Sequence, residues 1–225
     1  MKVPSKKIDI HSIRYINLDR RPDRREHVEA LCNQYFKVPV RRQKAFDGDS
    51  LNISGPKACF MSHITIWQEI AASSTQENNF VIILEDDINV RPDLPVERVD
   101  QLLTKMTVPS TCEIIFLSHL PPKLKSPSYQ KPNEYRVELM ARRQYCWTES
   151  YAITPSLARK LLPISATLMQ KHYVDEVLRA VVPTRYALNP GIFFQDHARF
   201  GTDIQRWSKS PWQYAWQEDS SPNTS

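Results

Sequence analysis

Two periods of hydrophobic and polar positions alternate along the first half of the chain. Segments rich in apolar, β-branched and aromatic residues predict strands, and they lie at 12–18, 38–46, 80–84 and 113–117. The segments between them carry apolar residues at helical spacing, over 22–36, 56–74 and 96–106. Strands that alternate with helices in this way predict an α/β domain, with a central, mostly parallel but mixed sheet flanked by helices.

The second half of the chain is less regular. Residues 119–133 hold four prolines and predict a loop. Short strands are expected near 135–140 and 148–153, and helices over 155–163 and 174–182. The expected organisation is a single domain over 1–206, in two halves at about 12–118 and about 119–206, with a C-terminal tail over 207–225.

Composition and charge exclude several classes of protein. The chain has no run of about 18 apolar residues, so no membrane span is expected. Its first 16 residues lack the apolar stretch of a secretory signal, which makes the cytoplasm the default location, or a secretory lumen if the chain is trimmed from a longer protein. Four scattered cysteines form no CxxC pair, which argues against a zinc site. A net charge of +5 suits an anionic small ligand better than nucleic acid.

Three acidic residues follow the most apolar strand in the sequence. Glu85, Asp86 and Asp87 come directly after FVIIL, and ligands of open parallel sheets bind at the carboxyl ends of strands. If the backbone stays extended, Glu85 and Asp87 point to one side and Asp86 to the other. Paired carboxylates are suitable ligands for Mg²⁺ or Mn²⁺, which substrate phosphates often complete. The alternative is an acidic, solvated junction between a strand and a loop.

The nucleotide motifs of other folds are absent from the sequence. It contains neither GxGxxG nor GxxxxGK[ST]. Instead, the first strand runs into Asn17-Leu18-Asp19 and the arginine-rich segment RRPDRR at 20–25. Arginine binds phosphate through two hydrogen bonds, and helix N-termini attract anions. Together with the acidic triplet, this segment indicates a nucleoside diphosphate site, although solvated arginines are the competing interpretation.

Several motifs in a fixed order resemble glycosyltransferase family 25, which includes bacterial lipooligosaccharide and collagen hydroxylysine galactosyltransferases. In order they are YINLDRRPDRR (15–25), AFDG (45–48), GPKACFMSHITIW (55–67), ILEDD (83–87), ESYAITPSLARKLL (149–162), VDE (174–176), Gln195 and GTDI (201–204). The resemblance covers roughly residues 12 to 205. Ala58 departs from the glycine usual in the family, and Thr202 departs from its serine.

The resemblance implies a GT-A-type nucleotide-sugar-binding fold, with the donor half at about 12–118 and the acceptor half at about 119–206. It also implies inverting transfer of a hexose, with galactose expected, from a UDP-sugar. It implies Mn²⁺ or Mg²⁺ as cofactor, with Asp87 as the direct ligand, Glu85 on the metal or the ribose, and His197 as the late histidine ligand. A packing or surface histidine is the alternative for His197.

The implied donor-binding residues are Asn17, Leu18, Arg21, Arg24, Asp47, Gly48, Ser62, His63, Glu85 and Asp86. Two of these choices compete with plainer roles, since His63 could be a packing histidine and the Asp47-Gly48 pair a simple turn. Asp86, on the other side of the chain, is expected to support the loop, so that Asp86→Asn is the mildest change among the three acids.

Inverting transfer requires a general base for the acceptor hydroxyl. Asp175 is the first candidate and Glu176 the second, and the competing role for Asp175 is a helix N-cap. The acceptor stays open between a glycan and a hydroxylysine side chain.

Two other functions compete with a transferase. A metal-dependent phosphohydrolase would need further carboxylates at neighbouring strand ends, where Asp19 stands alone. A non-catalytic relative that binds carbohydrate or nucleotide would not need Glu85, Asp87 and Asp175.

Overall fold

The structure is a computed structural model, and it describes residues 4–91, 99–118, 135–141, 147–169, 173–201 and 203. The expected proline-rich loop at 119–133 and the expected tail from 207 lie outside these residues, as does Cys146.

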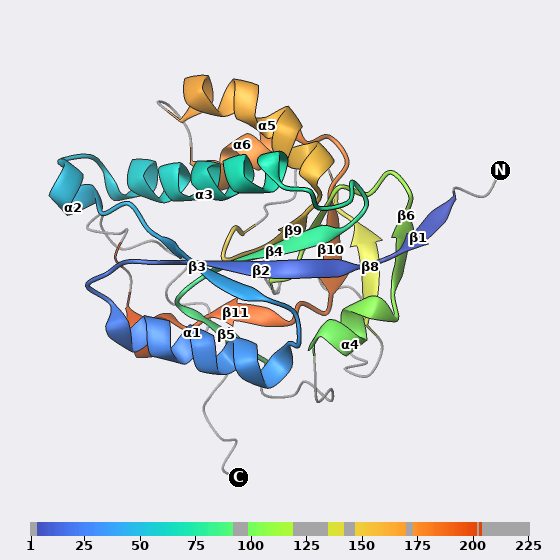
Figure 1. The fold of residues 1–225 in the computed structure, drawn as a ribbon, viewed down its shortest axis with the longest axis horizontal. Helices are drawn as coiled ribbons and strands as arrows, with labels where there is room; N and C mark the ends of the chain where they lie inside the picture. Colours follow the sequence, from blue (N-terminus) through green and yellow to red (C-terminus); the bar gives the residue numbers. More distant parts are fainter. Residues whose placement is uncertain are drawn as a thin grey trace, which may run out of the picture.

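A seven-stranded sheet forms the centre of the fold (Figure 1). Its spatial order is β3 (Val40–Lys44), β2 (Ile10–Asn17), β4 (Phe80–Glu85), β9 (Ser150–Ile153), β7 (Ile114–Phe116), β10 (Tyr186–Asn189) and β8 (Arg136–Leu139). β9 runs antiparallel to both of its neighbours, and β8 runs antiparallel to β10. The other five strands point the same way. The predicted mixed but mostly parallel sheet is therefore confirmed.

Helices cover both faces of the sheet (Figure 1). α3 (Gly55–Ala72), α5 (Pro155–Leu168) and α6 (Val174–Val181) lie on one face, and α1 (Pro22–Tyr35) and α4 (Val99–Thr104) lie on the other. Two short helices, α2 (Gly48–Leu51) and α7 (His197–Phe200), complete the set of described helices. No helix within the described ranges combines the length and the apolar character that crossing a bilayer requires.

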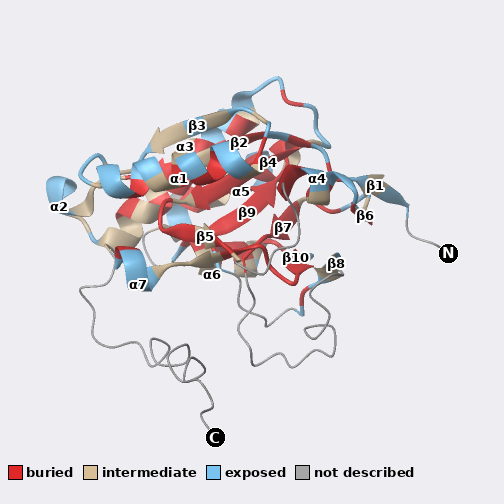
Figure 2. Cartoon of the chain, turned by 90° about the horizontal axis from the view of Figure 1, so that it is seen from below, coloured by how far each residue is buried: buried red, intermediate tan, exposed pale blue. Residues whose placement is uncertain are grey.

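Strand β4 divides the core into two clusters. Its side chains alternate, so that Phe80, Ile82 and Leu84 pack towards α1 and α4, while Val81 and Ile83 pack towards α3 and α5. Both faces of β4 are therefore buried, and Figure 2 shows the central strands in the colour of buried residues. This explains why β4 is an unbroken apolar run and not an alternating one.

Short pairings outside the main sheet were not predicted. β1 (Ser5–Lys7) pairs with β6 (Thr107–Pro109), and β5 (Ile88–Val90) pairs with β11 (Phe193–Gln195). Three residues are too few to show a hydrophobic period. The second pairing matters for the site, because it brings the segment around Gln195 beside the end of β4.

Candidate active site

A cleft opens where β2 and β4 end, at the edge of the sheet where the sequence predicts a ligand site. Its lining includes, among others, Asn17, Leu18, Arg20, Arg24, Asp47, Gly48, Cys59, Ser62, Glu85, Asp86, Asp87, Gln195 and Asp203. Of the predicted donor-binding and metal residues, Arg21, His63 and His197 are not part of this lining. Segments that are far apart in sequence meet here because parallel strands deliver their carboxyl ends to one edge.

The acidic triplet does not stay extended, contrary to expectation. β4 ends at Glu85, and Asp86 and Asp87 form the turn that leads into β5. Glu85 therefore faces α3, while Asp86 and Asp87 both contact the same arginine from α1. The expected pairing of Glu85 with Asp87 on one side of a strand is wrong, because a turn removes the alternation on which it depends.

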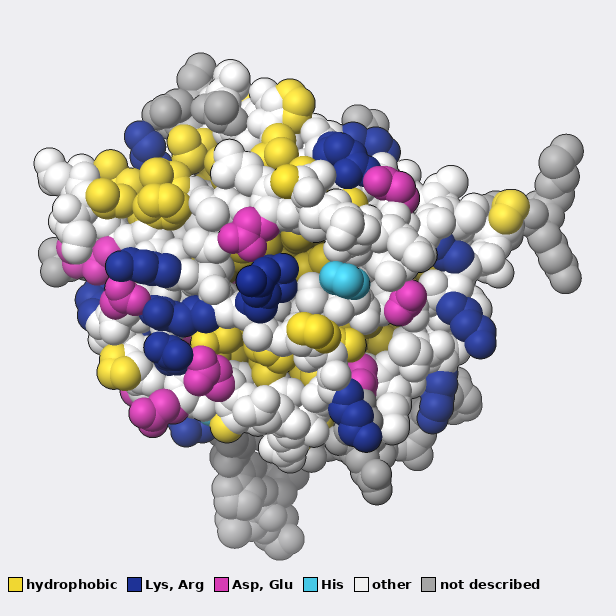
Figure 3. Space-filling model, viewed as in Figure 1, with side chains coloured by type: hydrophobic (Ala, Val, Ile, Leu, Met, Phe, Trp, Pro, Cys, Tyr) yellow, Lys and Arg dark blue, Asp and Glu magenta, His cyan; other side chains and the backbone are white. Residues whose placement is uncertain are grey.

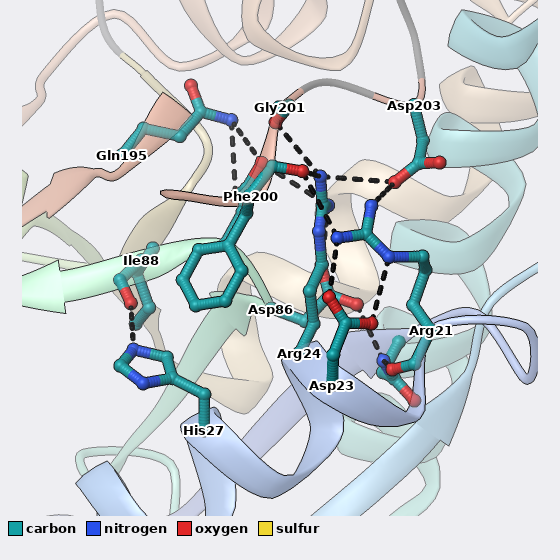
Figure 4. Close-up of polar contacts among 12 residues, drawn as sticks. Arg21, Asp23, Arg24, His27, Asp86, Ile88, Gln195, Phe200, Gly201 and Asp203 are labelled. Carbon is teal, nitrogen blue, oxygen red and sulfur yellow. Dashed lines mark hydrogen bonds and ion pairs between the residues drawn. The ribbon is translucent and has the colours of Figure 1, made fainter. Parts of the chain in front are cut away.

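Arg24 is the arginine that joins these elements (Figure 4). Its buried guanidinium donates to Asp86 Oδ1 at 3.0 Å and lies 3.4 Å from Asp87 Oδ2. Its Nη2 donates to the carbonyl oxygens of Phe200 and Gly201 at 3.1 and 2.9 Å, and lies 3.1 Å from Asp203 Oδ2. Arg24 therefore acts as an internal clamp between α1, the β4 turn and the segment after α7.

The neighbouring arginines are also paired within the protein. Arg21 binds both carboxylate oxygens of Asp23 and donates to Asp203 Oδ2 at 2.5 Å. Arg20 donates to Asp203 Oδ1 at 2.7 Å and to Asp47 Oδ2 at 3.0 Å. Figure 3 shows basic and acidic side chains interspersed over the part of the surface where α1 and β3 lie. The expectation that this loop presents several free guanidiniums to phosphate therefore needs correction, because Asp203 and Asp23 occupy the side chains of Arg21 and Arg24.

Asp87 is held from two directions. The Nε2 of Gln195, on β11, donates to its two carboxylate oxygens at 3.1 and 3.2 Å, and Arg24 lies on the other side. Burial, and then the charge of Glu85, raise the pKa of Asp87 to about 7. Asp86 is also buried, and it accepts a hydrogen bond from Asn17 Nδ2 at 2.6 Å. Burial raises the pKa of Asp86 as well.

Glu149 adds a further carboxyl group that the sequence did not single out as a site residue. It is buried, and its backbone carbonyl accepts from the amide of Glu85 at 2.8 Å. Burial, with contributions from the charges of Glu85 and Asp87, raises its pKa to about 8. The region around the end of β4 thus holds more carboxylate groups than Arg24 alone can neutralise, which is the electrostatic setting of a divalent cation site.

His63 lies on the α3 side of Glu85. The ring is fully buried, its Nδ1 is 2.8 Å from the hydroxyl of Tyr151, and its Nε2 is 3.7 Å from Glu85 Oε1. Trp67 Nε1 donates to the same hydroxyl at 3.0 Å. His63 therefore does not line the open cleft but lies directly behind Glu85.

The Asp47-Gly48 pair belongs to a loop that specific contacts hold in place, and it is not a plain turn. Asp47 caps α2 by accepting from the amide of Asp49 at 3.1 Å. A Cβ added at Gly48 would lie 2.8 Å from the carbonyl oxygen of Ile53, so the backbone requires glycine here. Ser62 holds the same loop by accepting from the amide of Phe46 at 3.0 Å.

The candidate bases lie at the start of α6. Burial raises the pKa of Asp175, and the charges of Glu176 and Glu85 add to this effect. Glu176 instead accepts from the amide of Tyr173 at 3.4 Å, which is a capping contact. The N-cap of α6 is Tyr173, so the capping role considered for Asp175 does not apply.

His197, the expected late metal ligand, begins α7 and is exposed. From the same segment, Gln195 is the side chain that contacts Asp87 in this structure. Gln195 and Asp203 belong to the closing motif, so a signal for both was present in the sequence. Tyr151 and Glu149 also lie in a matched motif, but no pattern in the sequence indicated that they lie behind Glu85.

Comparison with known proteins agrees with this arrangement of motifs. The sequence model of "Glycosyltransferase family 25 (LPS biosynthesis protein)" matches residues 52–178. A "Glycosyltransferase 25 family member" of Anopheles gambiae is 28% identical, with 93% of this chain and 37% of the relative aligned. A Bos taurus protein named "Probable inactive glycosyltransferase 25 family member 3" is 27% identical with the same coverage. The chain thus spans little more than a third of the length of these relatives.

A relative from Acanthamoeba polyphaga mimivirus is named "Putative glycosyltransferase R655". It is 34% identical over 95 residues, and the alignment covers 35% of this chain and 29% of that protein. Among solved structures, a glycosyltransferase involved in the glycosylation of the major capsid of PBCV-1 aligns with a TM-score of 0.45 at 12% identity, covering 78% of this chain and 80% of that one. A likeness this distant carries no argument about activity. The family match spans more than half of the 225 residues, and this chain belongs to glycosyltransferase family 25.

Proposed function

We propose that this chain is an active, divalent-cation-dependent glycosyltransferase that moves a hexose, galactose, from a UDP-sugar to a hydroxyl group of a glycan or hydroxylysine acceptor. The observation that carries the proposal is the cluster of carboxyl side chains at the end of β4. Glu85 and Asp87 line the cleft, and Asp86 and Glu149 are buried beside them.

The residues present fit a hard cation such as Mn²⁺ or Mg²⁺. Burial and mutual repulsion raise the pKa values of Asp87 and Glu149, so their negative charges are only partly compensated by the neighbouring side chains. Glu85 and Asp87 would hold the ion, while the exposed His197 would have to approach from α7. When bound, such an ion neutralises charge on a departing nucleoside diphosphate.

The chain's own side chains supply the remaining tasks. Gln195 and Arg24 fix both oxygens of Asp87, so the orientation of this carboxylate is set before any ligand arrives. The loop from Phe46 to Gly48 forms part of the wall of the cleft, with Ser62 and the α2 cap holding it in place. Arg20 lines the cleft, and its side chain is more exposed to solvent than those of Arg21 and Arg24.

Asp175 is the candidate base for the acceptor hydroxyl. It lies near Glu85, and its raised pKa moves it towards the range in which a carboxylate accepts a proton efficiently. Glu176 is the less suitable candidate, because its carboxylate is engaged at the start of α6.

Calorimetric titration with UDP, with and without Mn²⁺, tests the donor half of this proposal. Binding should require the metal and should weaken strongly in Asp87→Asn, while Asp23→Asn, on the solvent side of α1, should bind as the wild type does. UDP binding that is indifferent to both Mn²⁺ and Asp87→Asn would refute the metal bridge.

The second candidate function is a non-catalytic relative, which the "inactive" or "probable inactive" names of four mammalian relatives favour. Metal-dependent release of UDP from UDP-galactose distinguishes the two. Binding of UDP without any release, over a panel of glycan and hydroxylysine-peptide acceptors, would favour the non-catalytic function.

A further inference from the structure

Cys59, His63 and Glu85 form a compact group at the wall of the cleft, with His63 buried directly behind the other two. Cys59 and His63 are four residues apart on α3, so they lie on the same face of the helix, which faces the end of β4. One candidate ligand atom from each of the three side chains lies within 4.8 Å of the other two. Cys59 and Glu85 line the cleft, so an ion has a path to this group.

The imidazole of His63 points a polar atom into this group. The ring is fully buried, and its Nε2 has no hydrogen-bond partner among the described residues. Glu85 Oε1 lies 3.7 Å from this nitrogen, which is beyond hydrogen-bond distance. A buried polar atom without a partner costs free energy, so its persistence calls for an explanation such as an ion.

The other ring nitrogen already has the partner that a metal-binding histidine needs. Nδ1 is 2.8 Å from the hydroxyl of Tyr151, which also accepts from Trp67 Nε1. A hydroxyl oxygen has two lone pairs, so it can accept from both nitrogens. In that arrangement His63 carries its proton on Nδ1, and the lone pair of Nε2 is directed towards Cys59 and Glu85.

The spacing and the chemistry of the group select a particular class of ion. Two ligands bound at about 2.1 Å in a tetrahedral site are about 3.4 Å apart, so the 3.7 Å between His63 and Glu85 needs little adjustment. Thiolate and imidazole ligands favour Zn²⁺ or Co²⁺ over Mg²⁺ and Mn²⁺. We propose that Cys59, His63 and Glu85 form a site for a thiophilic divalent cation of the Zn²⁺ class, distinct from the hard-cation site assigned to Asp87.

This site does not depend on transferase activity. Its ligands are defined by geometry alone, and only Glu85 is shared with the proposed hard-cation site. Three protein ligands leave a fourth tetrahedral position open towards the cleft, as in zinc sites that bind a water molecule.

Titration of the purified, reduced protein with Co²⁺ tests the proposal without any sugar nucleotide. A sulfur-to-cobalt charge-transfer band and intense visible bands of a tetrahedral ion should develop and should disappear when Zn²⁺ is added. Cys59→Ser should abolish the charge-transfer band. His63→Gln should weaken cobalt affinity by at least about 100-fold, since loss of an outer partner alone costs about 10- to 100-fold.

Matched controls separate this site from other thiols and from misfolding. Cys112→Ser, which removes a buried thiol elsewhere in the core, and Cys146→Ser should retain the full band. Asp87→Asn should also retain it, whereas it should impair Mn²⁺-dependent UDP binding. Circular dichroism melts confirm that each variant is folded. A folded wild type without the band, or a band that survives Cys59→Ser, would overturn the proposal.

Discussion

Arg24 and Asp86, 62 residues apart in sequence, form a buried ion pair with 3.0 Å between Nη1 and Oδ1. The same guanidinium also binds the carbonyl oxygens of Phe200 and Gly201. The pair therefore fixes the turn after β4 relative to both α1 and the segment that follows α7. Arg24 was expected to bind phosphate, but in the structure it determines the position of the turn formed by Asp86 and Asp87.

Removing Arg24 should destabilise the protein strongly. Arg24→Ala leaves the buried Asp86 without its cation, and breaking one side of a buried pair costs about 3–5 kcal/mol in the free energy of unfolding. Arg25→Ala is the matched control, because Arg25 is exposed and pairs with Glu29 one helical turn away. The control should change stability by less than about 0.5 kcal/mol in urea denaturation. Equal effects of the two changes would contradict the clamp.

Asp86→Asn should affect folding more than metal binding. The asparagine has one acceptor oxygen for the two donors that Asp86 serves, Asn17 Nδ2 and Arg24 Nη1, and it removes the charge that Arg24 faces in the buried interior. We expect a lower midpoint in urea with Mn²⁺-dependent UDP binding retained at saturating metal. A loss of UDP binding as large as that in Asp87→Asn would assign Asp86 to the metal instead.

Gly48→Ala should disturb the wall of the cleft. The added Cβ would meet the Ile53 carbonyl oxygen at 2.8 Å, which is backbone that cannot move aside as a flexible side chain does. Overpacking of this kind costs about 1–3 kcal/mol. Ser50→Ala, at an exposed position in the same short helix, is the control. Thermal melts and UDP titrations of the two variants check this, and a normal Gly48→Ala protein would show that the loop is looser than the structure indicates.

Stability without metal should fall as the pH rises from about 5 to 8. Glu149 has a pKa of about 8 in the folded protein, above its ordinary value of 4.5, so the native state keeps a proton that the unfolded chain releases. The stabilisation that the protonated Glu149 contributes is therefore fully present below the pKa that Glu149 has in the unfolded chain. It is lost as the pH rises through the pKa of Glu149 in the folded protein.

Glu149→Gln removes this titration and should raise the melting temperature at pH 8 by a few °C, on the order expected for about 1 kcal/mol in a chain of this size. At pH 5 the change should be much smaller. Glu26→Gln, exposed on α1, should shift the melting temperature equally at both pH values. An unchanged pH dependence in Glu149→Gln would show that other groups dominate.

Asp175→Asn should reduce turnover by about 10²- to 10⁴-fold, the usual contribution of a general base, without weakening UDP binding. Glu176→Gln keeps an acceptor for the Tyr173 amide and should cost far less in kcat. Single-turnover transfer to an acceptor, compared with calorimetric UDP affinity, separates the two effects. A larger loss in Glu176→Gln would reverse the assignment of the base.

The β-α alternation, the order of the motifs and the run of acids after FVIIL could be read directly, because they depend on residues that are close in sequence. Six of the seven strands of the main sheet, and the helices that begin with Pro22 and with the Gly55-Pro56 pair, were therefore predicted to within a few residues, whereas the four-residue β10 was not predicted. Strands of three residues such as β5 and β11 could not be predicted, because so few positions contain no period.

The sequence by itself determined the fold class, the family and the edge of the sheet at which the chemistry is concentrated. Only the tertiary structure decided which partner each charged side chain has. Asp203 and the turn at Asp86 and Asp87 occupy Arg21 and Arg24, Gln195 orients Asp87, and His63 lies behind Glu85 beside Cys59. The physical reason is that charge and polarity can be read from residue types, whereas the burial and the distances that set pKa values and ligand geometry arise from segments up to about 180 residues apart.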